Sequence, residues 1–541
     1  MPKRIILGCL ARSEIASDGG TFLTTPTLAY TPEDQAILRR HVTNLTGNIY
    51  CIMNLPEEVV AVMFAYVSRS PRSFRDNLLR LIKDREIDTE TLIAAYADMN
   101  VPLEAAQEKA RDFHERVTLG YGHSSVSELS TARVGIERVS RIASAELELA
   151  NPFLSFIEYS QRYQKPKRGD VYEPEVLSEH PDLQALFRET CDRLYDAYEK
   201  LNQGLLPYLQ EKIPREEDES DARYTSRIEK IAFEDARYVL PLATLTNLGM
   251  VGNARAIRDA IVKLLSSTYP ESVRMAEDIR TEVLKVLPTL LRHAHPSPYH
   301  AAAQEALERF MHQSVFRADT ADAETDLSQL PGVELLDFTG KGAENPEAEA
   351  MRALLDMALC HGCTTGTPLP AHGLTTASYE SMVQAVQMLK EGLGPHDNPI
   401  DAFSAVRYRV RFVVSEANWH QLLRHSRKIR FSWSYPRRDL GVVLPPNIQE
   451  AGLTDTFMAA VEVAEEAAWK LESVSPRAAD YLVTNAHRRL VTAEFDLWEL
   501  FHLINLRTTP EAQWDIRNTM ETLERLVQQV HPNLVSGARR R

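Results

Sequence analysis

The densest group of basic side chains in this 541-residue chain lies between Arg424 and Arg438. The stretch holds six lysines and arginines and no acidic residue, in a chain whose formal net charge is −15. Such a concentration attracts phosphate, and the planar fork of arginine suits bidentate recognition of a phosphate group. Trp433 and Tyr435, which stand among these charges, suit either stacking on a flat ring or packing in the core. A solvated surface patch is the alternative to an anion site.

A second candidate for chemistry is the tetrapeptide Ser160–Tyr163, which offers a hydroxyl, a guanidinium and a phenol within four residues. These groups suit a phosphate and a flat ring, although a tetrapeptide by itself is a weak signal.

Two further sets have the spacing of metal ligands, namely Cys360 with Cys363, and the histidines His293, His295 and His300. Neither has a second ligand pair at the spacing of a metal site. Helix-end or surface roles are therefore favoured, and no metal is predicted.

The same residue types occur twice in the same order, which indicates an internal repeat. The paired positions are His123 with His396, Glu128 with Asp401, Ser140 with Ser415, Ser160 with Ser434, and the hexads Met275–Arg280 and Ala512–Arg517. The offset is 273 residues at the histidines and 237 at the final arginines. The first copy therefore carries an insertion of about 36 residues, which we place in the charged stretch 164–221.

The repeat divides the chain into four parts. Residues 1–45 form an N-terminal extension, 46–316 a first copy, 317–345 a polar, turn-rich linker and 346–541 a second, more diverged copy.

Helical periodicity dominates both copies. Helices are predicted over 57–82, 253–265, 274–288, 456–473, 487–506 and 511–530. The runs 131–139 and 406–414 alternate as half-buried strands do. The fold class is therefore α+β with an excess of helix.

Composition indicates the class of protein and its compartment but not its activity. The 44% of hydrophobic and 25% of charged residues are typical of soluble globular proteins. The acidic balance argues against binding to nucleic-acid backbones. Five scattered cysteines suit a reducing compartment. The apolar run ending at Ala11 is too short for a secretory signal, and no stretch approaches a membrane span. A cytoplasmic location is expected.

The first half resembles the flavin-dependent thymidylate synthase family over most of residues 45–290. Five ordered blocks carry the resemblance: Gly122-His123-Ser-Ser-Val-Ser-Glu128; Ser140-Arg141; a segment with Ser155, Glu158, Ser160, Arg162 and Tyr163; Glu234-Asp-Ala-Arg237-Tyr-Val-Leu-Pro241; and Asn253-Ala-Arg255. The resemblance implies two tandem copies of that family's fold.

The departures from the family pattern are complementary between the halves. The first half has residues 150–152, Ala-Asn-Pro, where the family has Arg-His-Arg, and Leu264 where it has a late arginine. The second half supplies Arg424-His425 and Arg507 instead, but it has Asp496 and Trp498 in place of the family's Asn and Arg. One composite site per pair of halves, with a second site degenerate, is the hypothesis that follows.

The resemblance implies a role for each matching residue. Substrate binding is assigned to Gln421, Arg424, Glu158, Ser160, Arg162, Tyr163 and Arg237. Cofactor binding is assigned to His123, Glu128, Asn253, Arg255, Arg424 and His425, and catalysis to Arg507, facing the pyrimidine, and His123.

The activity that the resemblance implies is FAD-dependent methylation of dUMP to dTMP, with methylenetetrahydrofolate and NADPH as co-substrates. The alternatives are a related flavoenzyme that modifies another nucleotide, and a catalytically degenerate homologue that binds FAD or a nucleotide. The expected partners are small-molecule nucleotide and folate, with no nucleic acid and no membrane. A homodimer that imitates the family's tetramer is also expected.

Overall fold

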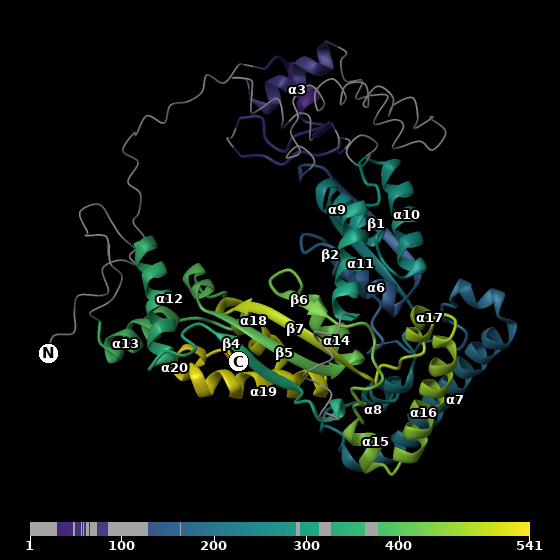
Figure 1. Cartoon of the computed structure of the whole chain (residues 1–541). Helices are drawn as coiled ribbons and strands as arrows, with labels where there is room; N and C mark the ends of the chain where they lie inside the picture. The colour runs from purple at the N-terminus through teal and green to yellow at the C-terminus, as the bar shows by residue number, and fades with distance from the viewer. Residues whose placement is uncertain are drawn as a thin grey trace. The chain divides into compact units, whose positions relative to one another are not determined.

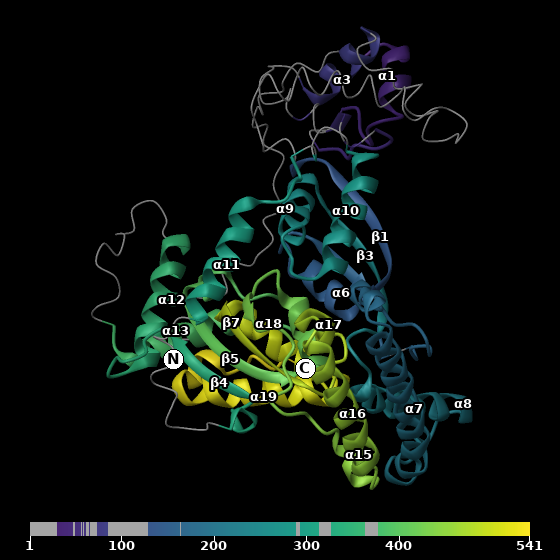
Figure 2. The ribbon, with the colours of Figure 1, turned by 45° about the vertical axis from the view of Figure 1, so that its right-hand side comes forward.

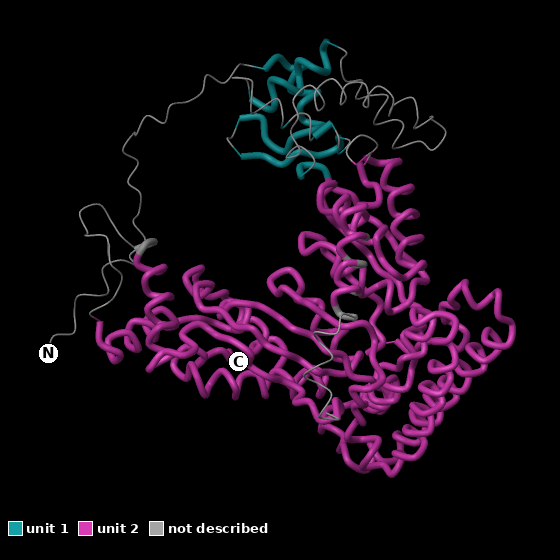
Figure 3. Tube along the Cα trace, viewed as in Figure 1, with its two compact units in different colours: residues 1–130 teal, residues 131–541 magenta. Residues whose placement is uncertain are grey.

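The computed structural model describes residues 30–46, 49–55, 57, 59–60, 64, 73–84, 128–162, 164–287, 291, 293–312, 326–362 and 377–540. It divides into two compact units, residues 1–130 and 131–541 (Figure 3). His123, Tyr163 and Cys363 lie outside the described residues.

The described part of the first unit contains two short capped helices, α1 (Pro32–Leu38) and α3 (Phe74–Lys83). Thr31 and Ser73 begin them with capping boxes, in which each side chain accepts a hydrogen bond from the N3 backbone. The helix predicted over 57–82 overlaps α3, whereas α1 was not predicted from the sequence.

The second unit contains two antiparallel sheets with the strand orders β1-β3-β2 and β4-β5-β7-β6 (Figure 1). Their strands are β1 (Thr131–Ser140), β2 (Ser155–Glu158) and β3 (Leu245–Asn253), then β4 (Val333–Phe338), β5 (Arg407–Ser415), β6 (Arg430–Trp433) and β7 (Arg488–Asp496). In the first sheet β3 lies between β1 and β2, and in the second sheet β7 lies between β5 and β6. The second sheet adds β4 at the edge beside β5.

Helices follow the equivalent strands in each half of this unit. The first set is α6 (Arg141–Glu148), η3 (Glu175–Glu179), α7 (Pro181–Lys212), α8 (Asp221–Ala236), η4 (Arg237–Val239), α9 (Ala254–Leu264), α10 (Pro270–Leu284) and α11 (Pro298–His312). The second is η6 (Leu327–Gln329), α12 (Pro346–Gly362), α13 (Tyr379–Lys390), η7 (Asp401–Ala405), α14 (Glu416–Leu422), η8 (Leu423–His425), α15 (Pro446–Glu450), α16 (Thr454–Glu472), α17 (Pro476–Asp480), α18 (Leu497–Arg507), α19 (Trp514–Val530) and α20 (Pro532–Val535).

Most of the helices and strands predicted from the sequence are present, and one prediction was wrong. Strands β1 and β5 and helices α9, α10, α16 and α19 lie where the periodicity placed them, within a few residues. The range 487–506 was predicted as one helix, but it is β7 followed by α18. Alternate side chains of β7 are buried, so a period of two holds through Asp496.

Two regions expected to be irregular or inserted have regular structure. The predicted linker contains β4, which pairs with β5 from Val333 to Phe338. The charged insertion becomes the 32-residue helix α7, which lies beside α16 in Figures 1 and 2 and shares a buried core with it. Among the described residues no helix is both long and apolar enough to cross a membrane.

A serine, a carboxylate and a tyrosine form the same hydrogen-bonded group twice. Ser140 caps α6 and donates through Oγ to Glu271 at 2.5 Å, and Tyr481 donates to the same carboxylate at 2.9 Å. Ser415 caps α14 and donates to Asp515 at 2.5 Å, and Tyr238 adds a bond of 2.9 Å. In both groups the tyrosine comes from the opposite half of the unit.

These groups correct the alignment of the repeat. Glu271 and Asp515 are equivalent, which gives an offset of 244 residues, against 275 at the capping serines. The hexads Met275–Arg280 and Ala512–Arg517 are therefore not equivalent, and the insertion is about 31 residues rather than 36. Ser434 donates its backbone N–H to the second sheet, and Tyr159 makes the same bond to the first sheet. Ser434 is therefore equivalent to Tyr159 and not to Ser160.

The two halves meet at an internal two-fold axis. Pro241 pairs with Thr484, the residue at its own position in the second half. The flanking backbone bonds are two-fold related: Leu242 N–H to Val483 O at 2.8 Å with Asn485 N–H to Leu240 O at 2.9 Å, and Ala243 N–H to Tyr481 O at 2.9 Å with Ala486 N–H to Tyr238 O at 2.8 Å. The halves therefore associate as the subunits of an isologous dimer do.

Candidate functional site

Six arginines from both halves form one cluster, which we call the arginine cluster. Its members are Arg141, Arg162, Arg237, Arg424, Arg489 and Arg507. Arg237 lies within electrostatic reach of Arg141 and Arg162, and Arg507 lies within reach of Arg162 and Arg424. The positive charges of these neighbours disfavour one another. Buried His420 lies near four of them. Its pKa is held well below the ordinary value, chiefly by burial and also by these four positive charges.

Two buried glutamates bind Arg424 across the halves. Its Nη1 lies 2.7 Å from Glu148, and its Nη2 bonds to Glu158. Glu158 also accepts from Arg141 at 2.6 Å and from Ser144 at 2.5 Å. Burial opposes ionisation of Glu158, but Arg141 and Arg424 outweigh it and lower its pKa. The predicted ligand Glu158 is thus occupied in holding two arginines.

Glu148 carries the opposite shift. Burial, opposed by Arg424 and reinforced by ionised Glu158, raises its pKa to about 8. Two carboxylates that share one guanidinium divide their protons in this way. Glu148 therefore holds the proton of the pair near neutral pH.

Arg162 and Arg489 also have carboxylate partners. Arg162 bonds through Nε to Glu234 and donates from Nη2 to the carbonyl of Glu511 at 3.0 Å. Arg489 lies 2.7 Å from Glu416. Ser160 accepts the backbone N–H of Arg162 at 3.2 Å, which fixes the turn that presents the guanidinium.

Arg237 and Arg507 differ from the other four arginines, because no carboxylate accepts a hydrogen bond from either within the described part of the chain. Arg237 is buried; its Nε donates to the carbonyl of Glu234 at 3.2 Å, and its Nη2 has no hydrogen-bond partner. Burial, together with Arg162 and Arg424, lowers the pKa of Arg507 to about 10. These two guanidinium groups, one from each half, suit an anionic ligand.

Two glutamine side chains near these arginines also have unused polar atoms. Nε2 of Gln161 and Oε1 of Gln421 are buried without a partner in the described structure. An unsatisfied buried donor or acceptor costs about 1–3 kcal/mol, which a polar ligand would recover. Donors from Arg237 and Gln161 fit phosphate oxygens, and the amide oxygen of Gln421 fits an N–H or hydroxyl of the same ligand.

His425 lies in a hydrogen-bonded chain that runs from Arg507 to Glu499. Arg507 Nε donates to His425 Nε2 at 3.0 Å, and His425 Nδ1 lies 3.3 Å from Glu499. Burial and Arg507 hold the pKa of His425 well below its ordinary value, so the neutral ring carries its proton on Nδ1. Glu499, whose pKa burial raises to about 8, accepts from that nitrogen.

Among the described residues, one group of side chains lies close enough in space to hold a metal ion. Its members are His425, Glu499 and His502, whose possible ligand atoms lie within 4.8 Å of one another. A metal on Nδ1 of His425 would require a proton on Nε2, facing the N–H of Arg507. This arrangement therefore favours the hydrogen-bonded chain over a metal centre.

The structure brings together most of the residues predicted for the site. Glu158, Arg162, Arg237, Gln421, Arg424, His425 and Arg507 are in or beside the arginine cluster, with Ser160 at its turn. Asn253 caps α9 and accepts from Ala256 N–H at 2.8 Å, and Arg255 lies in the first turn of that helix. Exposed Glu128 belongs to the first unit. His123 and Tyr163 lie outside the described residues.

Sequence reasoning missed the carboxylates that hold this site. Glu148, Glu234, Glu416 and Glu499 were not singled out, although each is paired with a member of the cluster or with His425. The sequence around Glu148 indicates a buried acid, because Glu148 stands between Leu147 and Leu149 in an apolar helix. An acid at such a position is buried and requires a partner.

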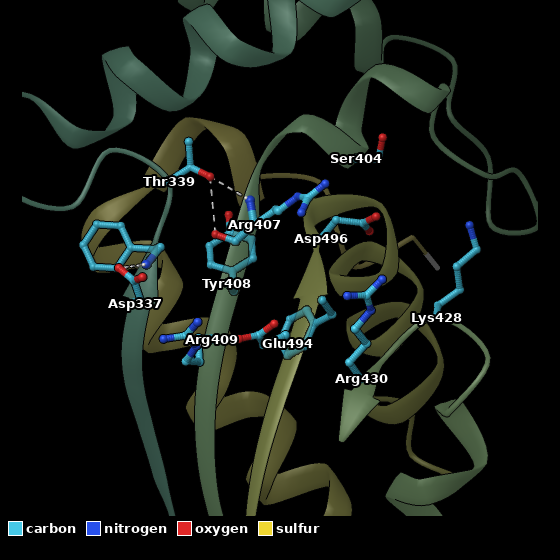
Figure 4. A pocket seen from close by; sticks show the side chains of 12 residues that line it. Asp337, Thr339, Ser404, Arg407, Tyr408, Arg409, Lys428, Arg430, Glu494 and Asp496 are labelled. Atoms are coloured by element: carbon cyan, nitrogen blue, oxygen red, sulfur yellow. Dashed lines mark hydrogen bonds and ion pairs between the residues drawn. The ribbon is translucent and has the colours of Figure 1, made fainter. Parts of the chain in front are cut away.

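The basic stretch 424–438 divides among three places. Arg424 enters the cluster, Arg437 and Arg438 pair with Asp439 and Glu472, and Lys428 and Arg430 line a surface depression of about 480 Å³ (Figure 4). The depression is lined by Asp337, Phe338, Thr339, Ser404, Arg407, Tyr408, Arg409, Lys428, Arg430, Glu494, Phe495 and Asp496. Arg409 and Glu494 neutralise each other there at 2.6 Å.

Comparisons with known proteins agree with this two-part organisation. The sequence model of the thymidylate synthase complementing protein matches residues 80–289 and 378–533. A UPF0159 protein of Chlamydia pneumoniae is 26% identical over 508 residues, which are 93% of each chain. A UPF0159 protein of Thermoplasma acidophilum is 26% identical over 492 residues, 83% of this chain and 94% of that one.

A shorter relative matches a smaller share of the chain. The flavin-dependent thymidylate synthase of Clostridium tetani is 27% identical over 217 residues, which are 38% of this chain and 83% of that protein. The two ranges matched by the sequence model together make up more than half of the chain. The chain therefore belongs to the thymidylate synthase complementing protein family.

Proposed function

We propose that the chain is a tandem flavin-dependent thymidylate synthase, in which two copies of the family's fold share one composite site. It would methylate dUMP to dTMP with methylenetetrahydrofolate and NADPH, and with FAD as cofactor. The supporting observation is the pair of buried Arg237 and part-buried Arg507 from opposite halves, neither of which donates a hydrogen bond to a carboxylate of the described residues. A nucleotide monophosphate supplies the negative charge that this pair lacks.

In the proposed site each half contributes a different part. Arg162 and Arg237 of the first half hold the phosphate, and Gln161 adds a donor. Arg507 of the second half faces the pyrimidine, where its guanidinium stabilises negative charge that develops on the ring oxygens. His425, neutral and bonded to Arg507 at 3.0 Å, fixes the orientation of that guanidinium.

The flavin supplies the hydride when bound. Arg424 and His425 remain the residues of the second half proposed to lie along it, with Asn253 and Arg255 from the first half. Arg424 fits this role in part, since its guanidinium is already bonded to two carboxylates and to the carbonyl of His420.

This engagement of Arg424 favours a second candidate function. A cofactor pocket in which the arginine is neutralised by Glu148 and Glu158 differs from one that offers a free cation. The alternative is therefore a related flavoenzyme that acts on another nucleotide, or a homologue that binds FAD or a nucleotide without catalysis.

The experiment is to purify the full chain and look for the visible absorbance of bound flavin. The reduced flavin is then mixed with dUMP and methylenetetrahydrofolate, and dTMP is measured. We expect dTMP in the wild type and a loss of about 10²–10³-fold in kcat for Arg507→Ala. Arg438→Ala, which removes an arginine paired with Glu472, is the matched control.

The outcomes separate the candidates. Bound flavin without dTMP, but with oxidation of the reduced flavin by another nucleotide, would favour the related flavoenzyme. Absence of flavin would leave the nucleotide-binding homologue. Equal activity of the wild type and Arg507→Ala would contradict the assignment of Arg507.

A further inference from the structure

The position related to the arginine cluster by the internal two-fold axis is occupied by the chain's own side chains. We infer from this that the chain has one nucleotide site and that its symmetry mate is permanently closed. The inference relies on the proposed function for the nature of the ligand, and on the geometry for the closed position.

Hydrogen bonds that recur in both halves show which residues of one half correspond to which residues of the other. The capping serines Ser140 and Ser415 align the segments after β1 and β5, and the Pro241–Thr484 pair aligns the segments before β3 and β7. The caps of α9 and α18, Asn253 and Asp496, continue this second alignment.

Three cations of the arginine cluster have no cationic counterpart. Arg424, nine residues after its capping serine, corresponds to Leu149, and Arg507, at the end of α18, corresponds to Leu264. Arg237 precedes Tyr238 as Asp480 precedes Tyr481, and these two tyrosines make two-fold related bonds. A nucleotide and its cofactor at the mate position would thus meet two leucines and a carboxylate at these three places, and Arg437, the counterpart of Arg162, is paired with Asp439.

The mate position is filled by four side chains, Tyr269, Tyr435, Arg477 and Asp480, which we call the aromatic plug. The Arg477 guanidinium lies 3.4 Å from the centroid of the Tyr435 ring, a stacked cation–π contact. The rings of Tyr269 and Tyr435 meet edge to face at 6.1 Å. Aromatic side chains with such contacts leave little room for a nucleobase.

In the alignment of the two halves, plug residues correspond to residues that lie at or beside the arginine cluster. Tyr269 begins α10 as Gln513 begins α19, and Gln513 accepts from Gln421 at 3.3 Å beside the arginine cluster. Tyr435 follows Ser434 as Ser160 follows Tyr159, at the end of each sheet pairing.

The charges within the plug are neutralised internally. Asp480 accepts from Arg477 and from the Tyr269 hydroxyl, both at 2.6 Å, and the Tyr435 hydroxyl lies 3.2 Å from Thr268. None of the four plug residues has a buried polar atom without a partner, whereas Arg237 of the arginine cluster does. Arg237 thus keeps a buried donor for an anion, and the plug offers none.

The test is the stoichiometry of dUMP binding to the full chain, measured by equilibrium dialysis. We expect one dUMP per chain, with affinity lowered at least tenfold in Arg237→Ala and unchanged within twofold in Arg477→Ala. Arg477→Ala is the matched control because it removes the arginine of the plug, which is the same residue type as Arg237. Two bound nucleotides per chain would overturn the inference, and so would loss of binding in Arg477→Ala with retention in Arg237→Ala.

A ligand-free measurement separates failure of the inference from failure of the proposed function. If no dUMP binds, the proposed function fails, and the closed position is judged from thermal unfolding alone. A packed plug predicts that Tyr269→Ala, at a side chain 2% exposed, and Arg477→Ala each lower Tm by about 3 °C or more. Trp469→Ala, at a side chain 70% exposed, is the control. An unchanged Tm in both plug variants would overturn the closed position whatever the nucleotide result.

Discussion

The pairing of Glu148 and Glu158 with one arginine makes the contact between the halves sensitive to pH. The pKa of Glu148 is raised from 4.5 to about 8, chiefly by burial. Between these values the folded chain holds a proton that the unfolded chain has released. The stability that this carboxyl contributes is therefore complete below pH 4.5 and is lost as the pH rises through about 8.

We expect Glu148→Gln to flatten the dependence of Tm on pH between 4.5 and 8, because glutamine keeps the shape of the protonated acid and does not titrate. Differential scanning calorimetry at several pH values measures this slope. Glu472→Gln, at the exposed partner of Arg438, is the control and should retain the wild-type slope. Equal slopes for wild type and Glu148→Gln would show that Glu148 does not hold the proton.

Residue types in sequence order were enough to propose the arginines of the site but not their partners. Arg162, Arg424 and Arg507 stand in ordered motifs that can be matched. Glu148 and Glu234 acquire their roles through contacts that span 276 and 72 residues. Spacing along the chain contains no information about such contacts, since the first depends on how the halves pack and the second on how the first half folds.

At the scale of elements, the repeated serine–carboxylate–tyrosine group links the start of a helix in one half to the other half. Removing a hydroxyl from it leaves a buried carboxylate with one donor fewer, at a cost of about 1–3 kcal/mol. Tyr238→Phe should cost more than Tyr481→Phe, because Gln513 also donates to the Tyr238 hydroxyl, at 2.9 Å.

Urea unfolding of both phenylalanine variants measures these costs. Tyr208→Phe is the matched control, because Tyr208 also donates to a carboxylate, that of Glu450, but at an exposed position. A cost for Tyr208→Phe as large as that for Tyr238→Phe would refute the role assigned to burial.

The turn between β4 and α12 offers a test of whether this edge strand is an integral element. Gly340 has φ of +86°, and an added Cβ would lie 2.3 Å from the carbonyl oxygen of Pro346. Gly342 has φ of +87° but open space around it. Gly342→Ala should cost about 1–2 kcal/mol from backbone strain alone, and Gly340→Ala clearly more.

Thermal unfolding of the two alanine variants measures this difference. Equal costs would mean that the backbone around Pro346 yields freely, and that β4 is held more loosely than its pairing with β5 indicates.

Amphipathic helices and alternating strands could be predicted from local pattern, whereas other elements depended on packing. β1 and β5 alternate clearly, and α9, α16 and α19 each show one apolar stripe. β3 contains Gly249 and Gly252, which weaken the strand signal, and β4 lies within a polar stretch. Their neighbours in the sheets, not their own residues, make these segments strands.

At the scale of the whole molecule, we retain the prediction that two chains associate. In the family as the resemblance describes it, sites lie between subunits of a tetramer, and each chain supplies two of the four copies. Sedimentation equilibrium should give twice the mass of one chain. A mass equal to one chain, unchanged over a hundredfold range of concentration, would contradict this prediction.

The pairing of Pro241 with Thr484 has a consequence for how such a protein can change over generations. In a dimer of identical chains every substitution appears twice, so a charge introduced at the axis faces a copy of itself. Here a single mutation alters only one of the two related positions. Arginine at 237 can therefore coexist with aspartate at 480, and a serine at 160 with a tyrosine at 435. Covalent linkage of the halves has allowed a symmetric architecture to hold an asymmetric interior.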